Sequence, residues 1–212
     1  EKLFKEQTVE IIFENMKTRT LFVPVKAFEI EAEDIELSEI STDSEGILSC
    51  ENVLKKGFTY TVKMYNPGVN DEEFTDLLRK SHKGLYEEFI NLLGRFARYS
   101  RGLIQVMLRN IILLSEYSEE VYSRYLQLPE NLPERVKELA LSITADYNNN
   151  YDKAKAVEQY LAKNYPYTLN PKPTSPGNDF VDSFLFDIKE GYCTYYATAM
   201  VVLLRCAGIP AR

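Results

Sequence analysis

The chain has 212 residues, of which 45% are hydrophobic and 27% charged, enough apolar material for a substantial globular core. Its formal net charge of −7 argues against nucleic acid as a partner, because binding phosphates needs a basic face. Three widely spaced cysteines exclude a disulfide framework, and no apolar run reaches the roughly 18–20 residues that cross a bilayer. The first residue is not Met and the N-terminus is no signal peptide, so we expect a piece of a longer protein.

Residues 1–66 are predicted to form a small antiparallel β domain. Apolar and polar residues alternate at 9–13 and again at 60–64, which is the pattern of a half-buried strand. Shorter β-like runs lie between these two segments. Pro67 and Gly68 end the region and mark a boundary.

Residues 67–117 are predicted to be a helical connecting segment. Its main feature is an apolar stripe at helical spacing, made of Leu85, Phe89, Leu92, Leu93 and Phe96. Seven Lys and Arg residues between 79 and 109 also give the segment a basic excess. Two interpretations stay open. Either the stripe packs and the basic face is solvated, which is the commoner arrangement, or a basic amphipathic helix lies on an anionic membrane.

Two further helices are predicted before residue 165. Asn131 is a candidate N-cap for the first, with Pro133 in its first turn, and an Asn of the run at 148–150 caps the second. The residues expected to face inward are Val136, Leu139, Ala140 and Ile143 on the first helix, and Ala154, Val157 and Leu161 on the second. Four prolines between 165 and 179 then predict an extended, irregular loop, and loops of this length inside a domain are often functional.

The last helix is predicted to begin at or near Cys193. Gly191 allows a tight approach just before it, and between 195 and 207 only Arg205 is charged, which is typical of a buried helix. Gly208 is a plausible C′ residue, and Pro210 prevents the helix from continuing. The sequence therefore places a thiol at the N-terminus of a rigid, central helix.

A thiol in that position has a chemical use. The thiolate is the nucleophilic form, and a free thiol has a pKa near 8.5. Lowering such a pKa to 7 requires about 2 kcal/mol of stabilisation of the thiolate. A helix N-terminus contributes about 0.3–1 kcal/mol of this, and an imidazolium partner normally supplies the rest. The free amides there can also hold an oxyanion. The other cysteines, Cys50 and Cys206, are interpreted as structural.

The stretch GYCTYYATAMVVLLRCAGIPAR at 191–212 closely resembles the first catalytic motif of the transglutaminase-like superfamily, a papain-like group of cysteine enzymes. Gly191, Cys193 and Ala197 match that motif, as do the Leu-rich helix, Arg205 and the closing Gly-Ile-Pro-Ala-Arg. In the family this Cys is the nucleophile. The resemblance therefore implies that Cys193 is the catalytic residue.

The resemblance extends over residues 118–212, which look like the bacterial membrane-anchored branch, where the domain lies outside the membrane between transmembrane helices. Residues 1–66 loosely resemble the small β domain that precedes the core there. We therefore expect an α+β fold with a β domain at 1–66 and a helical segment at 67–117. The N-terminal, Cys-helix half of a transglutaminase-like core is expected at 118–212. The implied location is the extracytoplasmic face of a bacterial membrane, with no cofactor and no metal.

The family's His and Asp follow the Gly-Ile-Pro-Ala-Arg stretch, whereas the only histidine here, His82, lies upstream and is interpreted as a surface residue. We therefore expect the chain to hold the nucleophile half of an active site and to be inactive by itself. We also expect an exposed thiol and bare apolar surface around Met200, Val201 and Leu204. Such a surface would let the chain self-associate.

For the parent protein the resemblance implies acyl transfer. Cys193 would form a thioester with a Gln side-chain amide or a peptide carbonyl, and an amine or water would take the acyl group. Transglutaminase, deamidase and peptidase activities stay open, and the expected partner is a protein or peptide substrate, Gln-containing or peptidoglycan-like. The alternative is a non-catalytic extracytoplasmic binding or scaffold module of the same fold.

Overall fold

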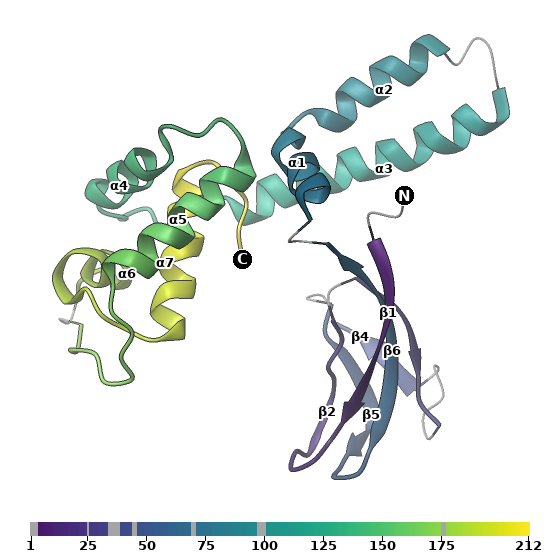
Figure 1. Ribbon diagram of the computed structural model, residues 1–212, viewed down its shortest axis with the longest axis horizontal. Coiled ribbons are helices and arrows are strands. Elements are labelled where there is room, and N and C mark those ends of the chain that lie inside the picture. Colours follow the sequence, from purple (N-terminus) through teal and green to yellow (C-terminus); the bar gives the residue numbers. More distant parts are fainter. Residues whose placement is uncertain are drawn as a thin grey trace. The chain divides into compact units, whose positions relative to one another are not determined.

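The structure, a computed structural model, describes residues 4–24, 26–33, 39–43, 46–68, 71–96, 101–174 and 177–212. Strands come first along the chain and helices follow (Figure 1), which confirms the predicted α+β class. The chain divides into two units, Glu1–Thr75 and Asp76–Arg212. The finer division into three domains stays a prediction.

The first unit contains two three-stranded antiparallel sheets, as predicted for an antiparallel β domain. One sheet has the order β1-β6-β3 and the other β2-β5-β4. The strands are β1 (Phe4–Ile12), β2 (Thr18–Leu21), β3 (Ala27–Glu31), β4 (Ile40–Thr42), β5 (Leu48–Leu54) and β6 (Thr59–Pro67).

The core of this unit draws side chains from both sheets. Phe13, Leu21, Cys50 and Tyr60 are buried in it, and burial raises the pKa of the Cys50 thiol. The Tyr60 hydroxyl donates to the carbonyl of Phe22 and accepts from its amide, both at 2.8 Å. The buried phenol is thereby satisfied, and Cys50 is a core residue, as interpreted from the sequence.

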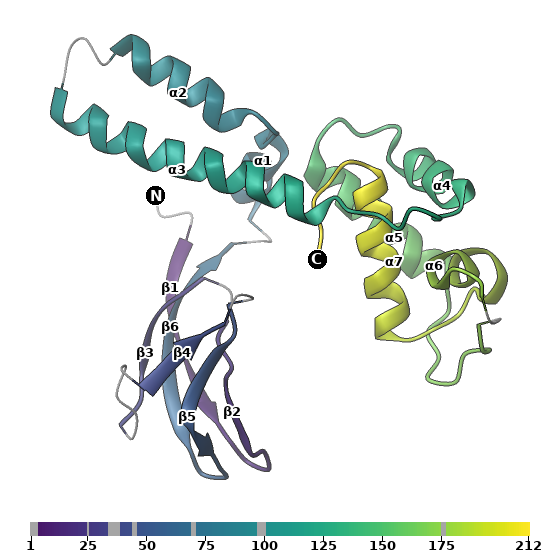
Figure 2. The ribbon, with the colours of Figure 1, turned by 180° about the vertical axis from the view of Figure 1, so that it is seen from behind.

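The remaining elements are helical (Figure 2). They are α1 (Glu72–Lys80), α2 (Leu85–Phe96), α3 (Arg101–Tyr125), α4 (Glu134–Thr144), α5 (Asn150–Asn164), α6 (Phe180–Asp182), the π-helical η2 (Ser183–Ile188) and α7 (Cys193–Cys206). The helices α2 and α3 pack side by side as a hairpin, and α4, α5 and α6 all contact α7 around one core. Among the described residues, no helix is both long and apolar enough to cross a membrane.

The apolar stripe predicted on α2 is only partly covered: Leu85 and Leu93 are half-buried, and the side chain of Phe96 lies outside the described residues. Phe89 and Leu92 are each 47% exposed, so the interpretation of a packed stripe is wrong for these two residues. The reason is that α3 covers only one side of α2, and in the described part of the chain no other element contacts α2 extensively.

The two predicted caps have different outcomes. Asn149 caps α5, because its Oδ1 accepts from the amide of Asp152 at 2.9 Å. Asn131 does not cap α4, whose N-cap position is Pro133, with no side-chain hydrogen bond. The amide of Leu132, a buried core residue, donates to the carbonyl of Pro129 at 3.2 Å and closes a turn before the helix. The helix therefore starts later than expected.

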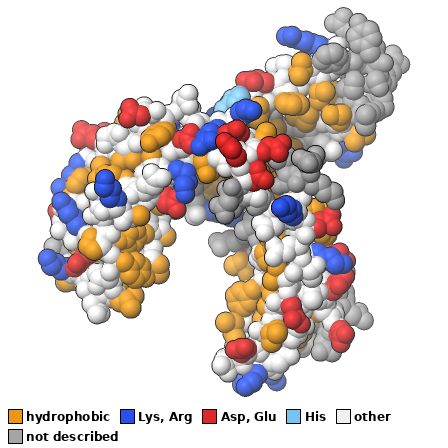
Figure 3. Space-filling view, viewed as in Figure 1, with side chains coloured by type: hydrophobic (Ala, Val, Ile, Leu, Met, Phe, Trp, Pro, Cys, Tyr) orange, Lys and Arg blue, Asp and Glu red, His pale blue; other side chains and the backbone are white. Residues whose placement is uncertain are grey.

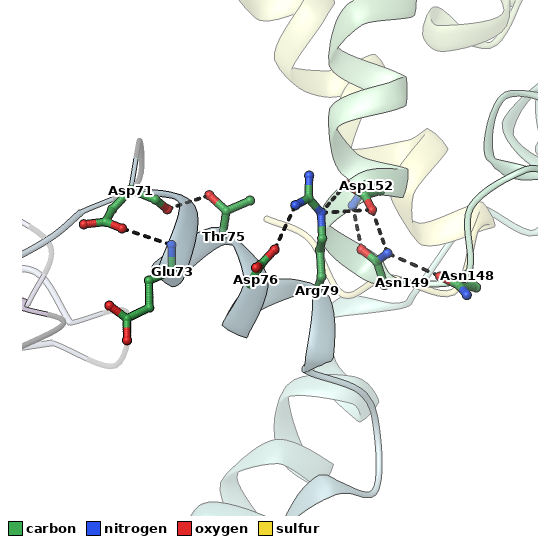
Figure 4. A network of polar contacts seen from close by, with 8 residues as sticks. All are labelled: Asp71, Glu73, Thr75, Asp76, Arg79, Asn148, Asn149 and Asp152. Carbon is green, nitrogen blue, oxygen red and sulfur yellow. Dashed lines mark hydrogen bonds and ion pairs between the residues drawn. The ribbon is translucent and has the colours of Figure 1, made fainter.

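A polar network joins the end of α1 to the start of α5 (Figure 4). Arg79 Nε donates to Asp152 and its Nη1 to Asp76, both at 3.1 Å, while the Asn149 amide donates to Asp152 at 2.8 Å. The hydrogen bond from Asn149, and then Arg79, lowers the pKa of the Asp152 carboxyl. Exposed pairs of this kind stabilise weakly, so the network contributes little to the stability of the fold.

Candidate active site

Cys193 is the first residue of α7, as predicted. Tyr192, at the N-cap position, is extended and makes no side-chain cap, and its carbonyl accepts from the amide of Tyr195 at 2.8 Å. The amides of Cys193 and Thr194 come before that of Tyr195, the first amide that donates to the Tyr192 carbonyl. Two backbone donors and the positive end of the helix dipole therefore lie at the thiol.

The proline-rich loop positions the start of α7. Tyr167 forms a parallel bridge with Gly191, in which the Thr168 amide donates to the Gly191 carbonyl at 2.8 Å. The Gly191 amide in turn donates to Pro166 at 3.3 Å. Gly191 is required here, because a Cβ at this position would lie 2.6 Å from Cγ of Tyr195. The close approach expected at Gly191 is thus confirmed, and its partner is the first turn of α7.

The three cysteines are free and differ in exposure. Cys193 is exposed, Cys206 is half-buried and Cys50 is buried. Burial raises the pKa of the Cys206 thiol, which makes it a poorer nucleophile at neutral pH. The thiol of Cys193 is therefore the accessible one, while its catalytic role stays a prediction.

Aromatic and apolar side chains lie on the face of α7 that carries Cys193. Exposed Tyr167 stacks on Tyr196, with ring centroids 6.1 Å apart, and the Tyr196 hydroxyl donates to the carbonyl of Tyr165 at 2.6 Å. A groove of about 230 Å³ runs between α5 and α7 and is lined by Tyr196, Ala197 and Met200 on the α7 side. These residues follow Cys193 by three, four and seven positions, so they share its face of the helix.

The helix α7 is buried on one side only, so the expectation of burial all round is wrong. Its buried residues are Tyr195, Ala199, Leu203 and Leu204, which face the core shared with α4, α5 and α6. The expected bare surface is also smaller, since Met200 and Val201 are half-buried and Leu204 is buried. Self-association through this surface stays a prediction.

Sequence reasoning missed the helical segment formed by α6 and η2. Asp179 caps it by accepting from the amide of Asp182 at 2.9 Å, and Phe184 packs on Tyr195 and Tyr165. A capping Asp followed by apolar residues at 180, 181, 184 and 185 was the available signal. This segment supplies the aromatic packing that supports the first turn of α7.

The end of the motif has a structural role. Arg205 donates to the carbonyl of Ala211 through Nε at 2.9 Å and Nη2 at 2.7 Å, and to the carbonyl of Gln127 through Nη1 at 2.7 Å. Gly208 has φ of 78°, as expected of a C′ residue. The single charge of α7 thus holds residues 208–212 back against the segment that precedes α4.

His82, the only histidine of the chain, is exposed, as interpreted from the sequence. Its Nδ1 lies 3.1 Å from the carbonyl of Lys80 and its Nε2 lies 3.0 Å from Glu88. These contacts, led by Glu88, raise the pKa of His82. Both ring nitrogens are therefore engaged between α1 and α2. In the described ranges, no group of three or more His, Cys, Asp and Glu residues could hold a metal ion.

Comparison with known proteins gives the site a context. Residues 137–212 match the model of the transglutaminase-like superfamily. Over 108 residues the chain is 50% identical to the uncharacterized protein YebA of Bacillus subtilis, and over 90 residues it is 40% identical to a protein-glutamine gamma-glutamyltransferase of Pseudomonas aeruginosa. These alignments take in 50% and 42% of the chain but only 15% and 13% of the two relatives.

Solved structures support the fold. The periplasmic domain of TgpA from Pseudomonas aeruginosa superposes with a TM-score of 0.58 and 21% identity, over 97% of this chain and 54% of that one. A second structure of that domain, bound to ethylmercury, superposes with a TM-score of 0.56 and 20% identity, over 97% of this chain and 56% of that one. The chain thus shares its fold with that periplasmic domain.

Proposed function

Residues 137–212 form a transglutaminase-like domain, and from this we propose that the chain is part of a cysteine acyltransferase whose nucleophile is Cys193. The observation that carries the proposal is the exposed thiol at the first residue of α7. A helix N-terminus favours the thiolate and offers amides for a developing oxyanion.

The proposed reaction has two steps. Sγ of Cys193 attacks the carboxamide carbon of a Gln side chain, the C–N bond breaks, and ammonia leaves with the proton of the thiol. The resulting thioester is then attacked by an amine, which forms an isopeptide bond and returns the proton to the sulfur, or by water, which gives Glu. Glutamine is the proposed acyl donor because the Pseudomonas relative is a protein-glutamine gamma-glutamyltransferase.

Among the described residues, no histidine lies free to act as the base for this chemistry. The two ring nitrogens of His82, the only histidine, contact the carbonyl of Lys80 and the carboxylate of Glu88. Proton transfer by a positioned base is worth about 10²–10⁴ in rate. We therefore propose that the chain alone turns over no substrate and that the intact protein, acting at the extracytoplasmic face of a bacterial membrane, provides the base.

Two measurements test the proposal. In the intact protein, incorporation of a fluorescent primary amine into a Gln-containing protein should be lost in Cys193→Ala and retained in the matched control Cys206→Ala. Ammonia release without amine incorporation would identify a deamidase, and peptide-bond cleavage a peptidase. Unchanged turnover in Cys193→Ala would refute the nucleophile, and absence of any turnover in the wild-type protein would favour the scaffold alternative.

The second measurement uses residues 1–212 alone. Iodoacetamide should alkylate Cys193 first, with buried Cys50 and half-buried Cys206 as slow internal references. Peptide mass spectrometry gives the rate at each cysteine. Faster labelling of Cys206 than of Cys193 would contradict the accessibility on which the proposal depends.

A further inference from the structure

The α2–α3 hairpin leaves two apolar stripes uncovered within the described part of the chain. On α2 the stripe contains Phe89 and Leu92, each 47% exposed. On α3 it contains Val106 and Leu113, which are 60% and 54% exposed and, seven positions apart, lie on one side of the helix. Figure 3 shows hydrophobic side chains gathered over this part of the molecule. Contiguous exposed apolar side chains of this kind mark interaction surfaces.

The part of the hairpin that bears the two stripes is basic, although the hairpin as a whole is neutral. Residues 89–114 contain four Arg and no Asp or Glu, whereas residues 85–125 carry five Arg against five Glu and the whole chain has a net charge of −7. Arg95 follows Leu92 by three positions, and Arg109 lies between Val106 and Leu113, so a cation flanks each stripe. Within the described residues no ion pair engages either arginine.

We propose that the α2–α3 hairpin lies on the surface of an anionic phospholipid bilayer. The two stripes enter the boundary between headgroups and acyl chains, and Arg95 and Arg109 extend their apolar stems along it to reach the phosphates. The hairpin lies on the bilayer rather than across it, because no described helix is long and apolar enough to span one.

Charge favours this occupant over a second copy of the chain. Two hairpins stacked through their stripes would bring the arginines of residues 89–114 of both copies together, whereas anionic headgroups complement these arginines. The rest of the chain carries an excess of Asp and Glu and is repelled by the same headgroups, which confines the contact to the hairpin. The inference does not depend on the catalytic role of Cys193.

The test is co-sedimentation of residues 1–212 with vesicles of phosphatidylglycerol and phosphatidylcholine, compared with phosphatidylcholine alone. Binding should require phosphatidylglycerol and weaken as salt is raised. Each cation near an anionic surface contributes about fivefold in affinity, so Arg95→Gln with Arg109→Gln should weaken binding about 25-fold. Leu113→Glu should weaken it more than tenfold by removing an inserted side chain.

Matched controls lie on other helices. Lys163→Gln on α5 removes an exposed cation, and Leu141→Glu on α4 replaces an exposed leucine, so both should leave vesicle binding unchanged. Circular dichroism confirms that every variant is folded. The proposal is overturned by absence of binding at low salt, by equal binding to both lipids, or by equal effects of hairpin and control variants. Self-association that Leu113→Glu abolishes, without lipid binding, would instead identify a second copy as the occupant.

Discussion

One added methyl group at Gly191 should disturb the start of α7. A Cβ at this position would lie 2.6 Å from Cγ and 2.7 Å from Cβ of Tyr195, so one of the two residues must move. The Tyr195 ring has little freedom, because it is buried and its centroid lies 4.7 Å from that of Phe180 and 5.5 Å from that of Phe184. Gly191→Ala therefore shifts the backbone that leads into Cys193.

The cost follows from overpacking a filled core. Such substitutions destabilise by about 1–3 kcal/mol. For a domain of this size each kcal/mol lowers the melting temperature by about 2–4 °C, so Gly191→Ala should lower it by roughly 3–10 °C. Since the bridge to Tyr167 moves as well, the rate of Cys193 alkylation should also change.

Thermal unfolding followed at 222 nm measures the effect. Gly94→Ala is the matched control: it lies within α2, nothing approaches within 4 Å of its added Cβ, and alanine is the better helix former by about 0.5–1 kcal/mol. Its melting temperature should rise. Gly191→Ala in a Tyr195→Gly background should cost little relative to Tyr195→Gly alone, because glycine removes both the Cβ and the Cγ that the added methyl group would meet. The reasoning is refuted if Gly191→Ala melts at the wild-type temperature, or if Tyr195→Gly fails to relieve its cost.

Three further substitutions test other parts of the structure. Asn149→Ala removes the cap of α5 and should lower the free energy of unfolding, measured in urea, by about 1 kcal/mol; no change would mean that the cap contributes nothing. Arg135→Ala leaves the buried Asp182 carboxylate without its guanidinium partner and should lower the free energy of unfolding by about 2–3 kcal/mol. This loss is smaller than for a fully buried pair, because Arg135 is half exposed. A smaller loss on replacing both residues would confirm that the unpaired carboxylate is the cause, and an equal loss would contradict it. Because Glu88 raises the pKa of His82, protonated His82 stabilises the α1–α2 junction below about pH 6.5, and that contribution is lost as pH rises through the higher folded-state pKa. An NMR titration of the single histidine should give a pKa that falls in Glu88→Gln, and an unchanged value would contradict the pairing.

Much of the candidate site could be predicted because its determinants are local. The start of α7 at Cys193 depends on Gly191, two residues before it, and its end depends on Gly208 in the left-handed conformation with Pro210 beyond. Likewise, Asn149 caps α5 through an amide three residues away, and alternation alone identified the strands at both ends of the β unit. Each of these features is determined within one or two turns of chain, so propensity and pattern suffice to find it.

Features that depend on distant segments were decided by the tertiary structure. The stripe at Phe89 and Leu92 was identified correctly as apolar, but only the packing of α3 shows that it stays uncovered. Tyr167 meets Gly191 across 24 residues, which no local pattern reveals. The sequence thus determined where a thiol begins a helix. The tertiary structure decided which face of that helix is buried and what surrounds the thiol, because those outcomes depend on which surfaces the chain brings together.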